Sequence, residues 1–328
     1  MPSTKLRTLL HGPKAYLTIV IAAMAIFFGA LAPEFLTADN FVDLVEGSSV
    51  TAILAIGLFV VLVAGGIDIS FAATASVAQY AAAYVATTSH LPMPVVIGIG
   101  LVVGVLLGCL NAVLIDRLRA TSIIITISTM SVFFALLMYF TGGRSIYDLP
   151  AWWSTPVVLA EFAGRNDSTV RVTLPIAAML TVVAATSLIM NRTSLGRQTF
   201  AMGGNVEAAR RAGISLTKTQ FFAYGYLGLM AGLAGLVQAH RVGEAVPNAM
   251  VGGELFVLAA AVLGGASLTG GSGSVGGVML GILLLAMLRN GLNLLGVSPY
   301  FFQILLGAVI LASAAMTGLK ARRVAGTA

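Results

Sequence analysis

The sequence contains few residues that could do chemistry, and they do not form a catalytic pattern. Only 9% of the residues are charged, and the three histidines, His11, His90 and His240, are far apart in the chain. The stretch GGASLTGGSGSVGG at Gly264–Gly277 has the glycines of a phosphate-binding loop, but it lacks the Gly-Lys-Ser/Thr ending whose lysine contacts phosphate. No nucleophile–base set and no metal-ligand spacing stands out. We therefore expect no enzyme activity, and no cofactor or metal bound by this chain.

A second stretch, GGNVEAARRAGIS at Gly203–Ser215, has the pattern of a short capped helix. A side chain suited to the N-cap is followed by an anion in the first turn, two cations in the last turn and a closing glycine. These residues are Asn205, Glu207, Arg210, Arg211 and Gly213. The predicted helix, Val206–Ala212, has about two turns and is too short to be stable alone. It needs a surface to dock on: either lipid phosphates beneath its arginines, or a protein partner that receives its small residues, Ala208 and Ala209.

The composition indicates that these stretches belong to a membrane protein. The 328 residues are 58% hydrophobic with a mean hydropathy of +0.98, whereas a soluble domain would have about 25% charged residues. Uncharged stretches of about the 20 residues that a membrane-spanning helix needs recur along the chain. Eight spans are predicted at Ala15–Ala32, Gly47–Ile67, Ile69–Ser89, Leu91–Ile115, Ala120–Gly143, Val172–Asn191, Thr219–Ala239 and Asn290–Leu319. Leu255–Leu288 is too long for one span, and we divide it into two that meet at the glycine-rich stretch.

The basic residues support an all-α polytopic membrane protein with about ten spans and both termini in the cytoplasm. In that topology thirteen of the 18 Lys and Arg residues lie inside and five outside, as the positive-inside rule requires. Their place at the membrane faces also means that the net charge of +6 does not indicate nucleic acid. The predicted parts are a cytoplasmic tail at 1–14, a transmembrane domain at 15–318 with a cytoplasmic loop at 191–218, and a cytoplasmic tail at 319–328. A cleaved signal peptide at Met1–Ala32 is the alternative for the first span.

The predicted spans contain almost no ionisable residues, which ion-coupled transporters need. Asp68, Glu254 and Arg289 lie near predicted span ends. We therefore expect a pathway without ion coupling, so that another subunit must supply the energy for any pumping. Polar side chains in or beside the spans are candidates for lining this pathway, with hydrogen bonds between helices as the alternative role. They are Gln79, Asn111, Thr126, Ser128, Asn290 and Asn293.

Four stretches of the sequence form a joint pattern. They are VAGGIDIS at Val63–Ser70, GCLNAVLIDRLRATSIIITISTM at Gly108–Met130, GGNVEAARRAGIS, and the segment Gly253–Phe301. Together they resemble the membrane permease of bacterial ABC importers for sugars of the ribose, xylose and arabinose type, over about residues 45–317. The sequence departs from the family pattern after GGIDIS, where Phe71–Thr74 stands in place of the usual Val-Gly-Ser and leaves the substrate open.

The resemblance implies a set of partners in the bacterial inner membrane, where the chain would also contact lipid. Two permease subunits, identical or different, would form the pore, and cytoplasmic ATPase subunits would hydrolyse ATP to drive it. A periplasmic binding protein would deliver the sugar. Furanose-type autoinducers, polyols and branched-chain amino acids are alternative solutes, and a stand-alone facilitator or secondary transporter is the alternative of a different class.

Particular residues receive roles in this interpretation. Val206–Ala212 would be the coupling helix that sits in a groove of the ATPase. Asp68, with Gly65, Gly66 and Ser70, is the candidate inner gate, and the alternative role for Asp68 is to cap the third span. Arg144 and Arg241, on the external side, are candidates for pairing with acidic residues of the binding protein.

Overall fold

The computed structural model describes residues 13–89, 91–163, 169–308 and 311. Apart from the first residues of the first helix, the predicted tails at 1–14 and 319–328 lie outside this range, as do His11, His90 and Arg165.

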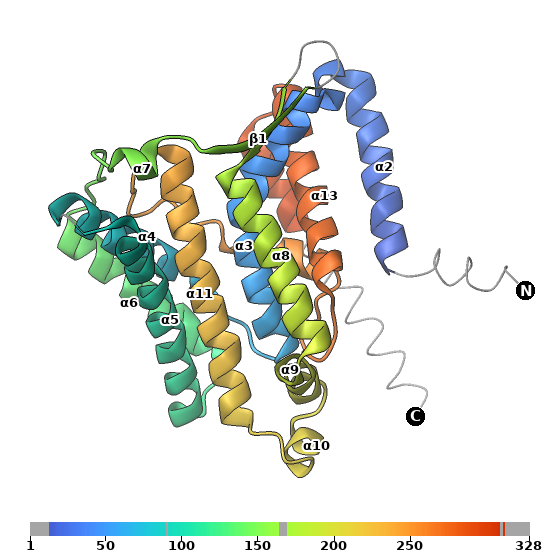
Figure 1. Cartoon of the computed structure of the whole chain (residues 1–328). Helices are drawn as coiled ribbons and strands as arrows, with labels where there is room; N and C mark the ends of the chain where they lie inside the picture. Colours follow the sequence, from blue (N-terminus) through green and yellow to red (C-terminus); the bar gives the residue numbers. More distant parts are fainter. Residues whose placement is uncertain (1–12, 90, 164–168, 309–310, 312–328) are drawn as a thin grey trace, which may run out of the picture.

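Helices form most of the described structure (Figure 1). The longer ones are α2 (Pro13–Leu31), α3 (Ala38–Val63), α4 (Phe71–Thr88), α5 (Met93–Leu118), α6 (Ser122–Thr141), α8 (Leu174–Arg192), α11 (Leu216–Val242) and α13 (Val275–Leu294). The shorter ones are η1 (Pro33–Leu36), α7 (Ala151–Ser154), α9 (Ser194–Gly204), α10 (Val206–Arg211) and α12 (Glu254–Leu263). A further apolar helix covers Pro299–Ala308.

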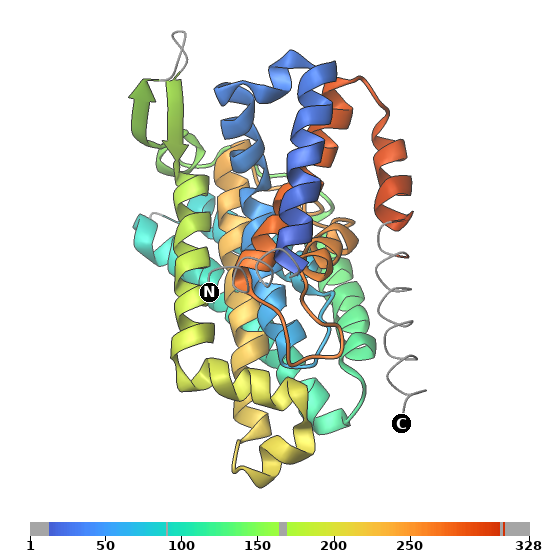
Figure 2. The same cartoon turned by 90° about the vertical axis from the view of Figure 1, so that its right-hand side faces the viewer.

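Six of the described helices, α3, α5, α6, α8, α11 and α13, are long and apolar enough to cross a membrane. The chain is therefore a helical, multi-pass membrane protein, as the sequence predicts. Successive long helices run between two opposite ends of the molecule (Figures 1 and 2). We call them the α10 end, at the bottom of Figure 1, and the hairpin end, at the top.

The hairpin end carries two strands that the sequence analysis does not predict. β1 (Val158–Ala163) pairs antiparallel with β2 (Thr169–Thr173), and an exposed ion pair of 3.2 Å joins Glu161 and Arg171 across them. In TVRVT four of the five residues are β-branched, and polar and apolar residues alternate. This pattern is typical of a strand. The all-α prediction therefore needs this one addition.

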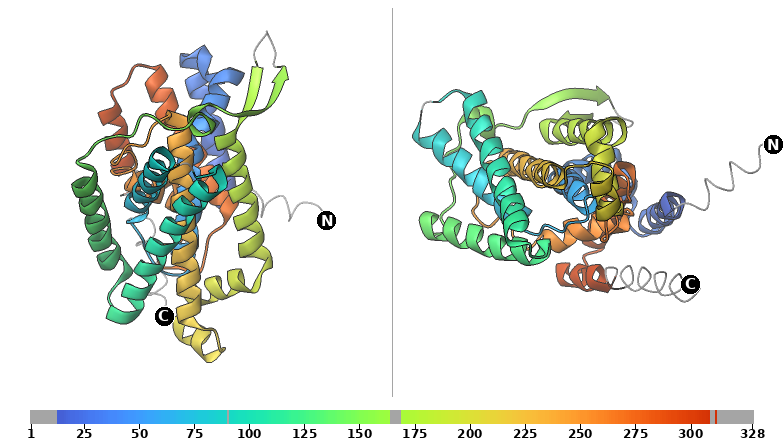
Figure 3. Two further views of the ribbon diagram at one scale, coloured as in Figure 1. Left: turned by 60° about the vertical axis from the view of Figure 1, so that its left-hand side comes forward. Right: turned by 90° about the horizontal axis from the view of Figure 1, so that it is seen from below.

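α3 lies at the centre of the bundle. From Ala52 to Val63 its side chains are buried all round, because α8, α11, α12 and α13 pack against it. Its first turns contain Asp39 and Asp43, which the predicted span from Gly47 left in an external loop; acidic groups at this position are favoured by the helix dipole. Seen from below (Figure 3, right), α4, α5 and α6 lie to one side of α11 and α2 and α13 to the other.

α11 and α5 approach each other closely because glycines face each other across the contact. A Cβ at Gly104 of α5 would lie 2.9 Å from the backbone nitrogen of Gly232 of α11, and one at Gly108 would lie 3.0 Å from the Cα of Gly228. Small residues four apart are how membrane helices pack without side chains between their backbones. This contact makes α11 the link between the two sides of the bundle.

α12 corrects part of the predicted topology. It has ten residues and spans about 15 Å, half of the roughly 30 Å of the hydrocarbon core. From its end, the glycine-rich segment continues without helix to the α10 end, where the amide of Gly271 donates to the carbonyl of Val63 over 2.9 Å. Non-helical backbone at membrane depth is tolerated where protein surrounds it. The predicted turn is present, but the helix before it is half a span.

Candidate functional site

The connection between α8 and α11 forms the outermost part of the α10 end. α9 turns across the bundle and α10 lies below it, at the lowest point of the molecule (Figures 1 and 2). α10 matches the predicted helix within one residue. The side-chain oxygen of Asn205 accepts from the amide of Ala208 over 2.9 Å, and Gly213 adopts a φ of +79°, so both predicted ends are confirmed. α9 was not predicted. In the structure its buried residues Thr199 and Met202 lie on the face that packs against the rest of the chain.

The surface of α10 divides into an inward and an outward side. Ala209 is 3% exposed and packs inside the chain, so it does not belong to a surface that a partner could touch. This corrects the prediction that grouped it with Ala208 as a contact residue. Ala208 is exposed, and so are Glu207 and Arg210, which form an ion pair of 3.1 Å. The outward side thus consists of Val206, Glu207, Ala208, Arg210 and Arg211, one apolar and one small residue among three charged ones.

The loop between α3 and α4 places Asp68 inside the protein. Asp68 is 2% exposed, and its Oδ1 accepts from both the amide and the hydroxyl of Ser70, each over 2.7 Å. The amide of Asn111, on α5, donates to Asp68 Oδ2 over 3.3 Å and to the Ser70 hydroxyl over 2.7 Å. The carboxylate therefore satisfies an amide at the start of α4 and also ties the loop to α5.

Two hydroxyls near the start of α6 hold the same loop. Ser122 accepts from the amide of Ile67 over 2.9 Å, and Thr126 accepts from the amide of Ile69 over 3.3 Å. Buried amides need such partners. Two glycines complete the loop: Gly65 has a φ of +88°, which favours glycine, and a Cβ at Gly66 would collide with the hydroxyl of Tyr224.

Three backbone segments meet beside this loop. Gly203, near the end of α9, lies between the end of α3 and the glycine-rich segment, and a Cβ there would collide with the carbonyl oxygen of Val63. That Cβ would also lie 2.6 Å from the nitrogen of Gly271, and one at Gly270 would lie 2.8 Å from the Cα of Gly65. The helix that carries α10 is therefore in direct backbone contact with the loop that carries Asp68.

The structure does not bring the predicted pathway residues together in one place. Asn111 and Thr126 are buried and hold the α3–α4 loop. Gln79 is 1% exposed and donates to the carbonyl of Glu244 over 3.4 Å. Ser128 is exposed on α6 and donates to its own helix, at Ile124. The remaining two, Asn290 and Asn293, line a pocket at the hairpin end.

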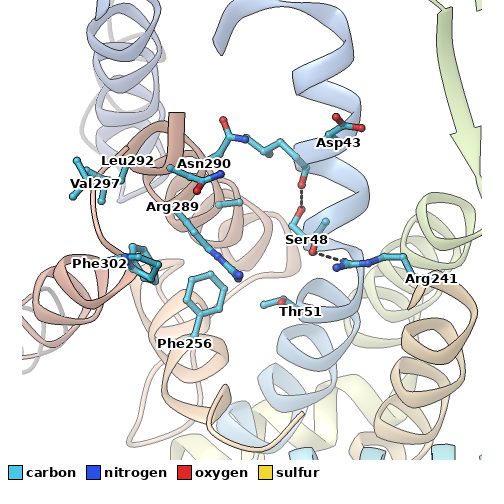
Figure 4. Close-up of a pocket in the computed structure, with 15 residues that line it drawn as sticks. Asp43, Ser48, Thr51, Arg241, Phe256, Arg289, Asn290, Leu292, Val297 and Phe302 are labelled. Atoms are coloured by element: carbon cyan, nitrogen blue, oxygen red, sulfur yellow. Dashed lines mark hydrogen bonds between the residues drawn. The ribbon is translucent and has the colours of Figure 1, made fainter. Parts of the chain in front are cut away.

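This hairpin-end pocket has a volume of about 350 Å³ and lies among α3, α11, α12, α13 and the segment that follows α13 (Figure 4). Two cations, one carboxylate, two amides, two hydroxyls and two aromatic rings face it. These residues are Arg241, Arg289, Asp43, Asn290, Asn293, Ser48, Thr51, Phe256 and Phe302. Except for the amides and the two arginines, sequence reasoning did not single them out, because they come from three separate segments: α3, α12 and the segment after α13.

Arg241 and Arg144, the predicted docking residues, both lie at the hairpin end with exposed side chains. Arg241 donates to the carbonyl of Gly47 over 2.9 Å and so closes one side of the pocket. The backbone carbonyl of Arg144 accepts from the Tyr80 hydroxyl over 3.0 Å. The two arginines therefore have different surroundings, and only Arg241 is part of a cavity.

Comparison with known proteins decides the class of this molecule. A family model described as the permease component of a branched-chain amino acid transport system matches residues 40–314. The chain belongs to this permease family. It is a component of a transport system and not an enzyme, as the sequence predicts. No solved structure matches it.

Several curated permeases are similar over nearly their whole length. Ribose import permease protein RbsC of Escherichia coli (strain K12) is 33% identical over 300 residues, which are 89% of this chain and 90% of that protein. Its namesake in Bacillus subtilis (strain 168) is 33% identical over 302 residues, 92% and 90% of the two chains. The D-allose transport system permease protein AlsC of Escherichia coli (strain K12) is 30% identical over 301 residues, 92% and 90%. The resemblance to sugar import permeases is thereby confirmed.

Proposed function

We propose that this permease is the translocation subunit of a binding-protein-dependent ABC importer that moves a monosaccharide, of the ribose type, into the cytoplasm. The observation that carries the proposal is the similarity to permeases named for ribose and allose, which extends over about nine-tenths of each chain. The chain binds no cofactor in this proposal, and ATP is hydrolysed by separate cytoplasmic subunits. A binding protein outside the membrane delivers the solute.

The α10 surface is the proposed contact with the ATPase. α10 lies at the lowest point of the molecule and presents Ala208 between exposed charges. A capped helix that rests on the rest of its own chain through Ala209 is held in a fixed orientation, which is what a groove on a partner requires. The lipid surface, the alternative for this helix, would contact Arg210, Arg211 and Val206, which is 47% exposed, but would gain nothing from the small exposed residue Ala208.

The α3–α4 loop is the proposed inner gate. Gly65, Gly66, Asp68 and Ser70 form it, and its contact with Gly203 joins it to the helix that precedes α10. Movement of α10 on a partner would therefore act on this loop directly. The N-cap residue of α4 is Ser70, not Asp68. Asp68 supports that cap, because its carboxylate accepts from the Ser70 amide while it is bonded to α5.

A second permease subunit and lipid are the proposed partners of the outer helix faces. Only 22% of the most apolar part of α5 and 28% of that of α6 is buried within the chain, against 72% for α3. Apolar faces of this size need cover from lipid or from another chain. The proposed orientation puts the α10 end in the cytoplasm of a bacterium, since Arg117, Arg192 and Arg197 lie there with Arg210 and Arg211.

Reconstituted transport tests this function. Proteoliposomes that contain the chain, its ATPase and the loaded binding protein should import D-ribose or a related sugar only when ATP is present on the ATPase side. The spans offer no ion-coupling group, so a proton or sodium gradient should not replace ATP. Uptake by the chain alone under such a gradient would contradict the proposal, and ATP-driven uptake of leucine but of no sugar would favour the amino acid alternative.

A further inference from the structure

Arg289 is a charged side chain whose position the fold alone does not explain. It lies in α13, five residues before the helix ends at Leu294, and it faces the hairpin-end pocket. It makes no ion pair or hydrogen bond with any other residue that the structure describes. Its side chain is exposed, one to two turns before the helix end, where a long basic side chain can reach the membrane interface. The guanidinium therefore keeps five donors available to whatever enters the pocket.

The side-chain amides of Asn290 and Asn293, next to Arg289, differ in whether they already have hydrogen-bond partners. Asn290 exchanges two hydrogen bonds with Asn40, of 2.9 and 3.1 Å, so its side chain is fixed at the edge of the pocket. Asn293 lines the same pocket and is exposed, and its side-chain amide has no hydrogen bond with any residue that the structure describes. Its amide can both donate and accept. One wall of the pocket thus offers a guanidinium and a side-chain amide that are free to bond a solute, and Asn290 between them is fixed by its bonds to Asn40.

The opposite side of the pocket is aromatic. Phe256 and Phe302 have ring centroids 5.8 Å apart with planes inclined by 51°, and the guanidinium of Arg289 points toward Phe256 (Figure 4). Phe256 belongs to α12, whose ten residues cover only about half of the hydrocarbon core. Interrupted helices of this kind accompany solute sites in membrane transporters. A third side is made by the hydroxyls of Ser48 and Thr51 on α3.

We infer that the hairpin-end pocket is a solute-binding site that takes a polyhydroxy compound of monosaccharide size. The inference rests on the proposed function and names the place where the solute is held on entry from outside. The volume of about 350 Å³ is in the range of small-molecule sites, which are apolar pockets with a few polar groups that fix orientation. The donors of Arg289 and the amide of Asn293 suit several hydroxyls, and the rings suit the apolar face of a sugar.

An amino acid fits this lining less well. Its carboxylate could bind Arg289, but its ammonium group would need an anionic partner. Asp43 is the one carboxylate among the described residues that line the pocket, and it lies away from Arg289 at the start of α3 (Figure 4). A polyhydroxy solute needs no anionic partner and can bond to the uncharged polar side chains of the pocket, which outnumber its one carboxylate.

The test is protection of a cysteine in the pocket. Thr51→Cys is introduced together with Cys109→Ala, which removes the one native cysteine, and the complete importer is placed in lipid nanodiscs without binding protein. The rate of modification of residue 51 by a charged methanethiosulfonate is measured with D-ribose, D-allose, D-xylose or L-leucine. At twice its dissociation constant a bound sugar should slow the reaction about threefold, because the free fraction falls as 1/(1 + [L]/Kd).

Matched variants define the result. Thr155→Cys, which is exposed at the hairpin end and lies outside the pocket, should be modified at a rate that no solute changes. Arg289→Ala and, separately, Asn293→Ala should remove the protection at residue 51, while co-purification of the ATPase reports that each variant folds and assembles. Protection by leucine and by no sugar would overturn the inference. So would a complex that imports a sugar while none of these solutes protects residue 51. Protection in a complex that imports no sugar would instead overturn the proposed function.

Discussion

The amide of Gly271 donates to the carbonyl of Val63 over 2.9 Å, and this bond joins the glycine-rich segment to the last residue of α3. Gly203 packs against both partners, so the end of α9 contacts the bond directly. α9 leads into α10, and Val63 leads into the loop that holds Asp68. In the proposed coupling, a displacement of α10 would therefore be transmitted through backbone contacts, which have no side-chain freedom to absorb it.

Gly203→Ala should disrupt this contact. The added Cβ would collide with the Val63 carbonyl and lie 2.6 Å from the Gly271 nitrogen. Both are backbone atoms, so no side chain can move aside, and overpacking costs about 1–3 kcal/mol. We expect a lower apparent Tm in detergent and reduced ATP-driven uptake. Gly204→Ala is the matched control, because the nearest atom to its Cβ is 4.0 Å away. Equal stability and uptake for the two variants would contradict the proposed transmission.

Ala208→Trp tests docking of α10. Ala208 is exposed, so the variant should insert and fold normally, but the bulky ring should block entry into a groove and reduce co-purification of the ATPase. Ala151→Trp, exposed at the opposite end of the molecule, should have no effect. Normal co-purification of the ATPase with Ala208→Trp would contradict docking in a groove and favour the lipid-resting alternative.

Ala209→Trp should have a different outcome. Because Ala209 is 3% exposed, the ring has no space within the chain, and α10 should be displaced even when no ATPase is present. Proteolysis of the α9–α10 segment in the isolated permease measures this. Protection from protease equal to that of the unchanged protein would show that the site can expand.

Asp68→Asn and Asp68→Ala separate the gate from the cap. Asparagine keeps an oxygen for the Ser70 amide but turns a second donor toward the Asn111 amide, which already donates to Asp68. Alanine leaves the Ser70 amide without its acceptor, and a buried unsatisfied group costs about 1–3 kcal/mol. We expect Asp68→Ala to lower the apparent Tm more than Asp68→Asn, while uptake falls strongly in both. Loss of uptake in strict proportion to loss of Tm would leave Asp68 with the capping role alone.

Thr126→Val should loosen the same loop. It removes the hydroxyl that accepts from the Ile69 amide and keeps the shape of the side chain, so a loss of about 1–3 kcal/mol is expected for the unsatisfied amide. Ser128→Ala, on the same helix but exposed and bonded only to its own turn, should change the unfolding free energy by less than about 0.5 kcal/mol. Equilibrium unfolding in mixed detergent compares the two.

The local signals of the sequence predicted local structure well. Asn205 caps the start of α10 through its side chain, and Gly213 closes its end with a positive φ. Both signals were readable in the sequence because a cap depends only on residues a few positions apart. The apolar stretches located α4, α5, α6, α8 and α11 to within three residues at each end, but α3 begins nine residues before the predicted span from Gly47. The predicted span Asn290–Leu319 was wrong at its start, because α13 continues to Leu294 and the next helix begins at Pro299. The end of α12 at Leu263 agrees with the predicted glycine-rich turn, but its length of half a span was not predicted, because only the packing of the turn against Val63 shows that non-helical backbone completes the crossing.

The candidate sites were predictable only in part, because their members meet across long sequence separations. Asp68 was identified from its own motif, but its partner Asn111 was read as a pathway residue. Arg289 was noted as a charge near a span end, whereas Phe256 and Thr51 had no polar or periodic signal that would join them to it. Which residues meet in a site depends on which helices pack together, and a single sequence does not show which helices are neighbours.

The ten-residue length of α12 also bears on how the chain is made. A segment that covers about half of the hydrocarbon core leaves the polar backbone of the glycine-rich stretch exposed to lipid tails if it enters the bilayer alone. α13 and the end of α3 must already be in place to accept it, because Gly264 packs against Gly277 and Gly271 donates to Val63. Biosynthesis therefore has to deliver α12 and α13 to the membrane as one hairpin, after α3, and the order of the helices along the chain permits this.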